Sequence, residues 1–173
     1  MKKCLVVVDY QNDFVDGALG FEGAKNLDHV ISEKIEMYLN NGQDLIYTLD
    51  THYDNYLSTD EGRRLPIIHC VKGTPGHNVY GKTANYLNKA IKVFEKQTFG
   101  SLELGEFLKK QAYTSIEFVG LVTNMCVLSN VIIAKTALKD AKIIVDSKAC
   151  DSFDKKLHNE TLDVLKGIHI DVV

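Results

Sequence analysis

Several side chains that can do chemistry stand at the ends of apolar runs in this sequence. Asp9 follows CLVVV, Lys96 ends IKVFEK, and Cys126 comes a short turn after SIEFVGL. Asp50 ends a further run, DLIYTLD, and His52 lies two residues beyond it. A thiol, a carboxylate and an amine can perform nucleophilic catalysis, because the carboxylate accepts the thiol proton and later returns it to a leaving amine.

Cys126 is the candidate nucleophile. It is predicted to lie at the start of a helix, where the helix dipole favours a thiolate, and the ammonium of Lys96 would favour it further. Backbone N–H groups of residues 122–126 could form an oxyanion hole. The alternative is structural: Cys126 is a small buried hydrophobe, and Asp9 and Lys96 merely end strands.

Asp50, His52 and His69 form a candidate metal site. Three protein ligands with open coordination positions are typical of a catalytic metal. Zinc suits nitrogen and oxygen ligands, and iron or manganese is also compatible. The alternative is a loop of solvated histidines. The other histidines have no such partners: we expect His29 and His158 to be solvated on helices and His169 to lie in a strand, and His77 is left without a role.

The elements that must position these residues alternate between strand and helix, which predicts an α/β fold with a mostly parallel sheet covered on both faces. We expect a single domain over residues 1–173. Residues 51–82 are expected to form a long functional loop. Strands are predicted at 3–9, 44–50, 91–96, 115–121, 141–146 and 168–173, and helices at 25–41, 83–90, 102–111, 126–138 and 154–167.

In an open parallel sheet, ligands bind beyond the carboxyl ends of the strands, near the point where strand order reverses. The acidic, basic and thiol groups above are therefore expected to meet at one edge of the sheet.

Composition excludes several classes of function. The chain has 173 residues, 45% hydrophobic and 25% charged, with a net charge of −3, so nucleic-acid binding has no electrostatic support. No apolar run reaches the roughly 20 residues that span a bilayer, and Asp9 and Asp13 interrupt the N-terminal apolar run, which argues against a signal peptide. The cysteines form no CxxC pair, and we expect a cytoplasmic protein with reduced thiols.

Five segments stand out along the chain: DYQNDF at 9–14, LDTH at 49–52, HCVKGTPG at 69–76, FEKQTFGS at 94–101 and GLVTNMCV at 120–127. They resemble the signature segments of the isochorismatase-like cysteine hydrolases, in the same order and with similar spacing. The HCVKGTPG and LDTH segments look most like the nicotinamidase branch, which hydrolyses nicotinamide to nicotinate and ammonia.

This resemblance implies a three-layer α/β/α fold with a six-stranded parallel sheet, and a homo-oligomer. It implies the catalytic triad Asp9, Lys96 and Cys126, with an oxyanion hole formed by the backbone of Thr123 and Cys126. It further implies a divalent metal, usually zinc, that binds the ring nitrogen of the substrate and is held by Asp50, His52 and His69. A cis peptide four residues before the cysteine would be Val122–Thr123.

The sequence departs from the nicotinamidase pattern in its aromatic residues. Thr51 and Met125 stand where aromatics are common, Leu65 stands where a Trp is common, and the chain has no Trp. Candidate substitutes for the stacking wall are Phe14, Phe21, Phe99 and Tyr53. The substrate is therefore expected to be a small-molecule amide, nicotinamide first, with an N-carbamoyl or ureido compound as the alternative.

Two rival hypotheses concern the role of the site. In the first, the protein is a metallohydrolase in which metal-bound water attacks the substrate and Cys126 is incidental. In the second, the protein is a non-catalytic scaffold that hydrolyses no amide. Isochorismate is a weaker option, since enol-ether cleavage in that branch does not use this nucleophile.

Overall fold

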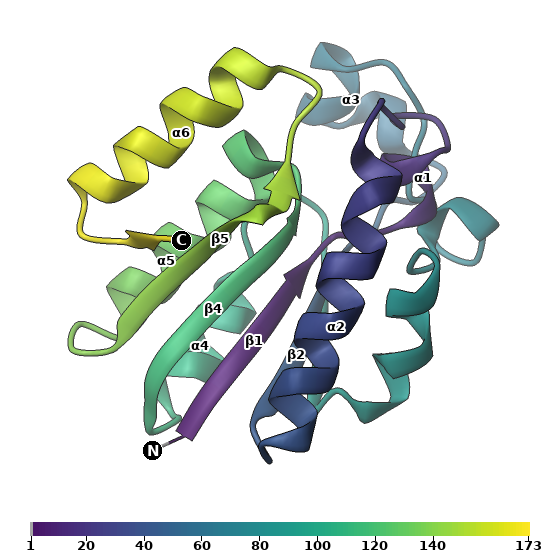
Figure 1. The fold of residues 1–173 in the computed structure, drawn as a ribbon. Helices are drawn as coiled ribbons and strands as arrows, with labels where there is room; N and C mark the ends of the chain where they lie inside the picture. The colour runs from purple at the N-terminus through teal and green to yellow at the C-terminus, as the bar shows by residue number, and fades with distance from the viewer. Residues whose placement is uncertain (1) are drawn as a thin grey trace.

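A six-stranded parallel sheet runs through this computed structural model, which describes residues 2–173 (Figure 1). The strand order is β3-β2-β1-β4-β5-β6. The strands are β1 (Lys2–Val8), β2 (Asp44–Asp50), β3 (Lys92–Lys96), β4 (Tyr113–Leu121), β5 (Lys142–Asp151) and β6 (Asp171–Val172). The predicted six-stranded parallel sheet is therefore confirmed.

Helices cover both faces of the sheet and enclose a hydrophobic core on each side. One core joins the sheet to α2, and the other joins it to α4, α5 and α6. In Figure 1, α2 lies in front of the sheet and α4 and α5 lie behind it. The predicted three-layer α/β/α arrangement is thus confirmed. The α-helices are α1 (Asn12–Val15), α2 (Leu27–Asn40), α3 (Asp60–Arg64), α4 (Leu102–Lys109), α5 (Leu128–Ala137) and α6 (Lys155–Gly167).

Residue patterning explains the central elements. The strand β1 is a β-branched run whose last five residues are all buried, as expected for a strand covered on both faces. In α2, the buried side chains of Leu27, Ile31, Ile35 and Tyr38 recur every three or four residues, which gives the helix one apolar face.

Strand order reverses at the centre of the sheet. From β1 the chain builds outward to β2 and β3 on one side, and then to β4, β5 and β6 on the other. The crevice between the carboxyl ends of β1 and β4 is therefore the expected ligand site. Gly120 allows these strands to approach here: its φ is +118°, and a Cβ would lie 2.0 Å from the Val8 carbonyl oxygen.

Several elements differ from the sequence-based expectations. The strand β5 continues to Asp151, and β6 is only two residues long. His169 is not in a strand, because its φ of +66° belongs to the turn after α6. The 51–82 segment contains α3 and two 3₁₀ turns, Tyr56–Ser58 and Pro75–His77, and a longer 3₁₀ helix spans Lys82–Lys89. Within the described residues, no helix has the length and apolarity needed to span a membrane.

Candidate active site

Asp9, Lys96 and Cys126 lie together at the carboxyl edge of the sheet. Asp9 follows β1, Lys96 is the last residue of β3, and Cys126 lies in a π-helical turn, Thr123–Val127, between β4 and α5. Lys96 Nζ is 2.5 Å from Asp9 Oδ2 and 3.6 Å from Cys126 Sγ. All three side chains are buried, but Cys126 also lines a cavity. The structure therefore brings these three predicted residues within interaction distance.

Asp9 is held by its backbone and by a neighbouring hydroxyl. Its φ of +46° is unusual for a residue other than glycine, and such strain is concentrated at functional sites. Thr48 Oγ1 donates a hydrogen bond of 2.7 Å to Asp9 Oδ1. This bond leaves Oδ2 to face Lys96, so the carboxylate has a fixed orientation toward the ammonium.

Burial dominates the electrostatics of the thiol and the carboxylate. Burial raises the pKa of Cys126 well above its usual value, and the charge of Lys96 lowers it by less. Burial also raises the pKa of Asp9, against the opposing effect of Lys96. Burial alone would lower the pKa of Lys96, but Asp9 and its other anionic neighbours raise it well above normal. Lys96 is thus a permanent cation, and the thiol is neutral at rest.

Four donors beside this trio form a candidate metal site. Asp50, His52, Glu61 and His69 each offer one ligand atom, and these atoms lie within 4.8 Å of one another. His52 Nε2 is 3.0 Å and His69 Nε2 is 3.4 Å from Asp50 Oδ2. His69 Nδ1 donates a 2.7 Å hydrogen bond to the Ile67 carbonyl, which fixes the tautomer and leaves Nε2 free to bind a cation.

The chemistry of this donor set fits a divalent cation. Two imidazoles and two carboxylates are suitable ligands for zinc, and also for iron or manganese. Burial alone would raise the pKa of Asp50, but Lys96 and the two histidines lower it well below normal, so Asp50 is ionised. Burial and the charge of Asp50 raise the pKa of Glu61, because the two carboxylates lie close together.

Glu61 is a member of this donor group that the sequence pattern did not indicate. It lies on α3 in the 51–82 segment, beside the equally acidic Asp60. Neither spacing nor composition distinguishes the two side chains. Helical geometry does, because Asp60 points to solvent with 73% of its side chain exposed, while Glu61 is half-buried and faces the histidines.

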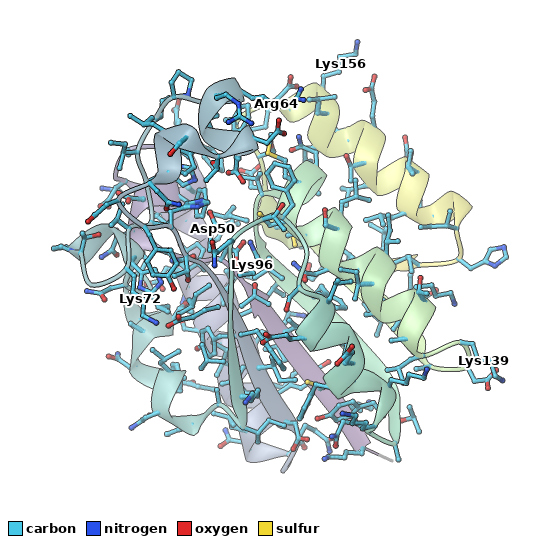
Figure 2. The ribbon with its side chains drawn as sticks, turned by 180° about the vertical axis from the view of Figure 1, so that it is seen from behind. Asp50, Arg64, Lys72, Lys96, Lys139 and Lys156 are labelled. Carbon is cyan, nitrogen blue, oxygen red and sulfur yellow. The ribbon has the colours of Figure 1, made fainter. Side chains whose placement is uncertain are left out.

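A cavity of about 780 Å³ opens over these groups. The predicted pocket residues Phe14 and Leu65 both line it, as does Phe99, whereas Phe21 and Tyr53 do not. Phe153 is a lining residue that was not predicted; it comes from the segment after β5, and its ring packs edge-on against Phe21. The charged or reactive lining includes Asp50, Glu61, Arg64, His69 and Cys126, and the apolar lining includes Phe14, Leu19, Leu65, Phe99, Val122, Met125 and Phe153. Figure 2 shows Asp50 and Lys96 close together at the end of the sheet.

The turn that carries Cys126 is a π-helix rather than the start of an α-helix. The N–H groups of Met125 and Val127 both donate to the Val122 carbonyl. Thr123 is fully buried, whereas its neighbours Val122, Met125 and Cys126 line the cavity. The predicted cis peptide is displaced by one residue: it joins Leu121 to Val122, not Val122 to Thr123.

Two histidines have more defined positions than the sequence suggested. His158 was expected to be solvated, but it is half-buried on α6, and its Nδ1 is 2.9 Å from Thr123 Oγ1. His77 is buried, and its Nε2 is 2.9 Å from Thr51 Oγ1. Thr51 stands in the sequence between two of the candidate metal ligands, Asp50 and His52. Burial lowers the pKa of both imidazoles. The partners of these histidines are 26 and 35 residues away in sequence, so local patterning carries no signal for them.

Comparison with known proteins places this arrangement in a family. The chain is 29% identical over 169 residues to an uncharacterized isochorismatase family protein, PncA, of Bacillus subtilis (strain 168), covering 91% of each. The crystal structure of nicotinamidase PncA from Bacillus subtilis superposes with a TM-score of 0.88 at 28% identity, over 100% of this chain and 99% of that one. A pyrazinamidase of Pyrococcus horikoshii in complex with zinc has the same fold, with a TM-score of 0.80 at 22% identity, over 100% of this chain and 99% of that one.

The Isochorismatase domain family matches residues 3–172, nearly the whole chain. The sequence segments, the order of the parallel strands and the match to this family all agree. The chain is a hydrolase of the isochorismatase family.

Proposed function

We propose that this protein is a cysteine amidohydrolase that converts nicotinamide to nicotinate and ammonia. The observation that carries the proposal is the contact of Lys96 Nζ with both Asp9 Oδ2 and Cys126 Sγ, on the wall of a largely apolar cavity. The nicotinamidase of Bacillus subtilis supports the choice of substrate, since it resembles this chain along its full length.

The raised pKa of the Cys126 thiol means that a base must remove its proton. Asp9 is that base, and its own raised pKa makes it a stronger acceptor than an ordinary carboxylate. Proton transfer leaves a thiolate beside the ammonium of Lys96. The thiolate attacks the amide carbonyl carbon, forming a C–S bond, and the carbonyl oxygen becomes an oxyanion.

The backbone N–H groups of Thr123 and Cys126, which the family resemblance implies as the oxyanion hole, would receive this oxyanion. Protonated Asp9 then gives its proton to the amide nitrogen as the C–N bond breaks, releasing ammonia. Asp9 next takes a proton from water, whose oxygen attacks the thioester carbon. The C–S bond breaks, the proton returns to sulfur, and the carboxylic acid product is released.

Asp50, His52, Glu61 and His69 would hold a divalent cation, which we propose to be zinc, with iron or manganese also compatible with these donors. When bound, the cation would orient the substrate by coordinating its ring nitrogen. Phe14 and Leu65 line the cavity and are proposed to contact the ring.

The test is ammonia release from nicotinamide and pyrazinamide, measured beside N-carbamoyl and ureido compounds with zinc present. Cys126→Ala is expected to abolish turnover, and iodoacetamide is expected to label Cys126 first. Release from the carbamoyl compounds alone would move the activity to the alternative substrate class. Turnover that survives Cys126→Ala but not chelation would instead establish a metallohydrolase.

A further inference from the structure

Asn130 is a fully buried polar side chain one helical turn after Cys126. Its amide nitrogen donates hydrogen bonds to two backbone carbonyls, that of Cys126 at 2.8 Å and that of Phe99 at 3.0 Å. Its Oδ1 accepts a 3.0 Å hydrogen bond from the backbone N–H of Ser101. A single planar group therefore joins the turn that carries the thiol to the segment 99–101.

The segment on the other side of this amide belongs to the same cavity. It directly follows Lys96, and Gln97, Thr98 and Phe99 all line the cavity wall. Asn130 thus connects the two backbone segments that carry the thiol and the ammonium, which lie 3.6 Å apart. None of its polar atoms touches the cavity, because the residue is fully buried.

Gly100 favours this connection, because the segment passes close to α5 here. A Cβ at this position would lie 2.7 Å from Ile133 Cδ1 and 3.3 Å from Ser129 Cβ, both on α5. A larger residue would require the end of the Ile133 side chain to move or the segment to shift away from the helix. The absence of a side chain lets the backbone approach closely enough for the short Asn130 amide to reach it.

We propose that Asn130 is a positioning residue that sets the location of Cys126 relative to Lys96 and to the cavity wall at Phe99. Both hydrogens of its amide are used, so a shift of either backbone segment is transmitted to the other. The assignment rests on the proposed role of Cys126 as nucleophile. Misplacement of reacting groups by about 1 Å can reduce turnover about 100-fold, so such a residue can matter without touching substrate.

Two substitutions distinguish the bond of Asn130 to Cys126 from its bonds to the segment 99–101. Asn130→Asp keeps the acceptor for the Ser101 N–H but removes the N–H donors to the Cys126 and Phe99 carbonyls. It also places a carboxylate oxygen next to these two carbonyl oxygens. Asn130→Thr can retain only the bond to Cys126, because a helix hydroxyl reaches the carbonyl four residues back and no farther. The control is Ser101→Ala, which removes the hydroxyl that caps α4 at Leu104 but keeps the backbone N–H bound by Asn130.

The primary readout is the rate of iodoacetamide alkylation of Cys126 against pH, with the labelled residue identified by mass spectrometry. It needs no substrate, so it separates failure of this proposal from failure of the proposed function. Turnover of nicotinamide then gives kcat and KM for each variant. Thermal unfolding gives the loss of stability of each variant, so that the Asn130 variants can be compared with the control Ser101→Ala.

We expect Asn130→Asp to shift the alkylation profile and to lower kcat about 10- to 100-fold. We expect Asn130→Thr to keep the alkylation profile of the wild type while KM rises, because only the wall segment is released. Ser101→Ala should lose stability without changing either quantity. An unchanged alkylation profile in Asn130→Asp, or an unchanged KM in Asn130→Thr, would overturn the proposal. So would an alkylation profile that shifts as much in Ser101→Ala as in Asn130→Asp. A shifted profile in a protein that hydrolyses no amide would uphold the positioning role and refute the proposed function.

Discussion

Lys96 Nζ lies 2.5 Å from Asp9 Oδ2 and 3.6 Å from Cys126 Sγ, so the buried ammonium is paired with the carboxylate and only borders the sulfur. The resting site therefore combines an ion pair with a neutral thiol, and transfer of the thiol proton to Asp9 moves the negative charge that faces Lys96 from oxygen to sulfur. Asp50 Oδ1, at 3.3 Å from Nζ, adds a further carboxylate to the same cation.

This pairing predicts that Lys96→Met is costly to stability as well as to activity. Removal of the cation leaves the Asp9 carboxylate buried without its partner, a change that typically costs about 3–5 kcal/mol. The double variant Lys96→Met/Asp9→Asn removes both charges and should recover much of that stability while remaining inactive. Urea unfolding of both variants is the measurement. A double variant no more stable than Lys96→Met would show that the ion pair does not explain the loss.

The parallel sheet and the common location of Asp9, Lys96 and Cys126 could be predicted from local sequence patterns. Apolar runs that end in Asp9, Asp50 and Lys96 predict parallel strands, and parallel strands place their carboxyl ends along one edge. Glu61, Asn130 and His158 could not be found in this way. Each acts through a partner in another element, and their roles depend on helix orientation and on loop approach, which local patterns do not encode.

Gly120→Ala is expected to be among the most destabilising small substitutions in the chain. Its φ of +118° is unfavourable for any residue with a Cβ, and that Cβ would lie 2.0 Å from the Val8 carbonyl oxygen. We expect a loss above about 4 kcal/mol by chemical unfolding, or no folded protein. Gly167→Ala is the control, because nothing lies within 4 Å of its added methyl group. Equal stability of the two variants would contradict the close approach of β1 and β4.

His158 is expected to make stability depend on pH. Burial lowers its pKa below the unfolded value of about 6.5, so the unfolded chain binds the proton more tightly. The contribution of His158 is therefore complete above that pH and is lost as pH falls through it toward the folded pKa. His158→Asn offers Thr123 an acceptor that does not titrate.

Urea unfolding of wild type and His158→Asn between pH 8 and pH 5 isolates this effect, since the other titrating groups, His69 and His77 among them, are common to both proteins. The stability difference should shift in favour of His158→Asn as the solution is acidified. A difference that stays constant over this range would show that burial does not lower the pKa of the His158 imidazole.

Glu61 gives a prediction in which the presence of metal reverses the sign of a stability change. In the metal-free protein, the half-buried carboxylate of Glu61 lies close to the buried carboxylate of Asp50. Burial and the charge of Asp50 raise the pKa of Glu61. Glu61→Gln removes that repulsion, so the metal-free variant should be as stable as the wild type or more stable. With zinc bound, the variant loses an anionic ligand and should be the less stable of the two.

Thermal unfolding with chelator and with zinc measures both signs, and competition with a chromophoric chelator measures affinity. We expect Glu61→Gln to weaken zinc binding by about 10-fold or more, in the range known for residues that support metal sites. Asp60→Asn is the matched control, because it removes the same charge from the adjacent residue of α3, whose side chain is 73% exposed. Equal weakening by both variants would mean that the general negative charge of α3 attracts the cation. In that case Glu61 would not be a ligand, and Asp50, His52 and His69 would hold the metal alone.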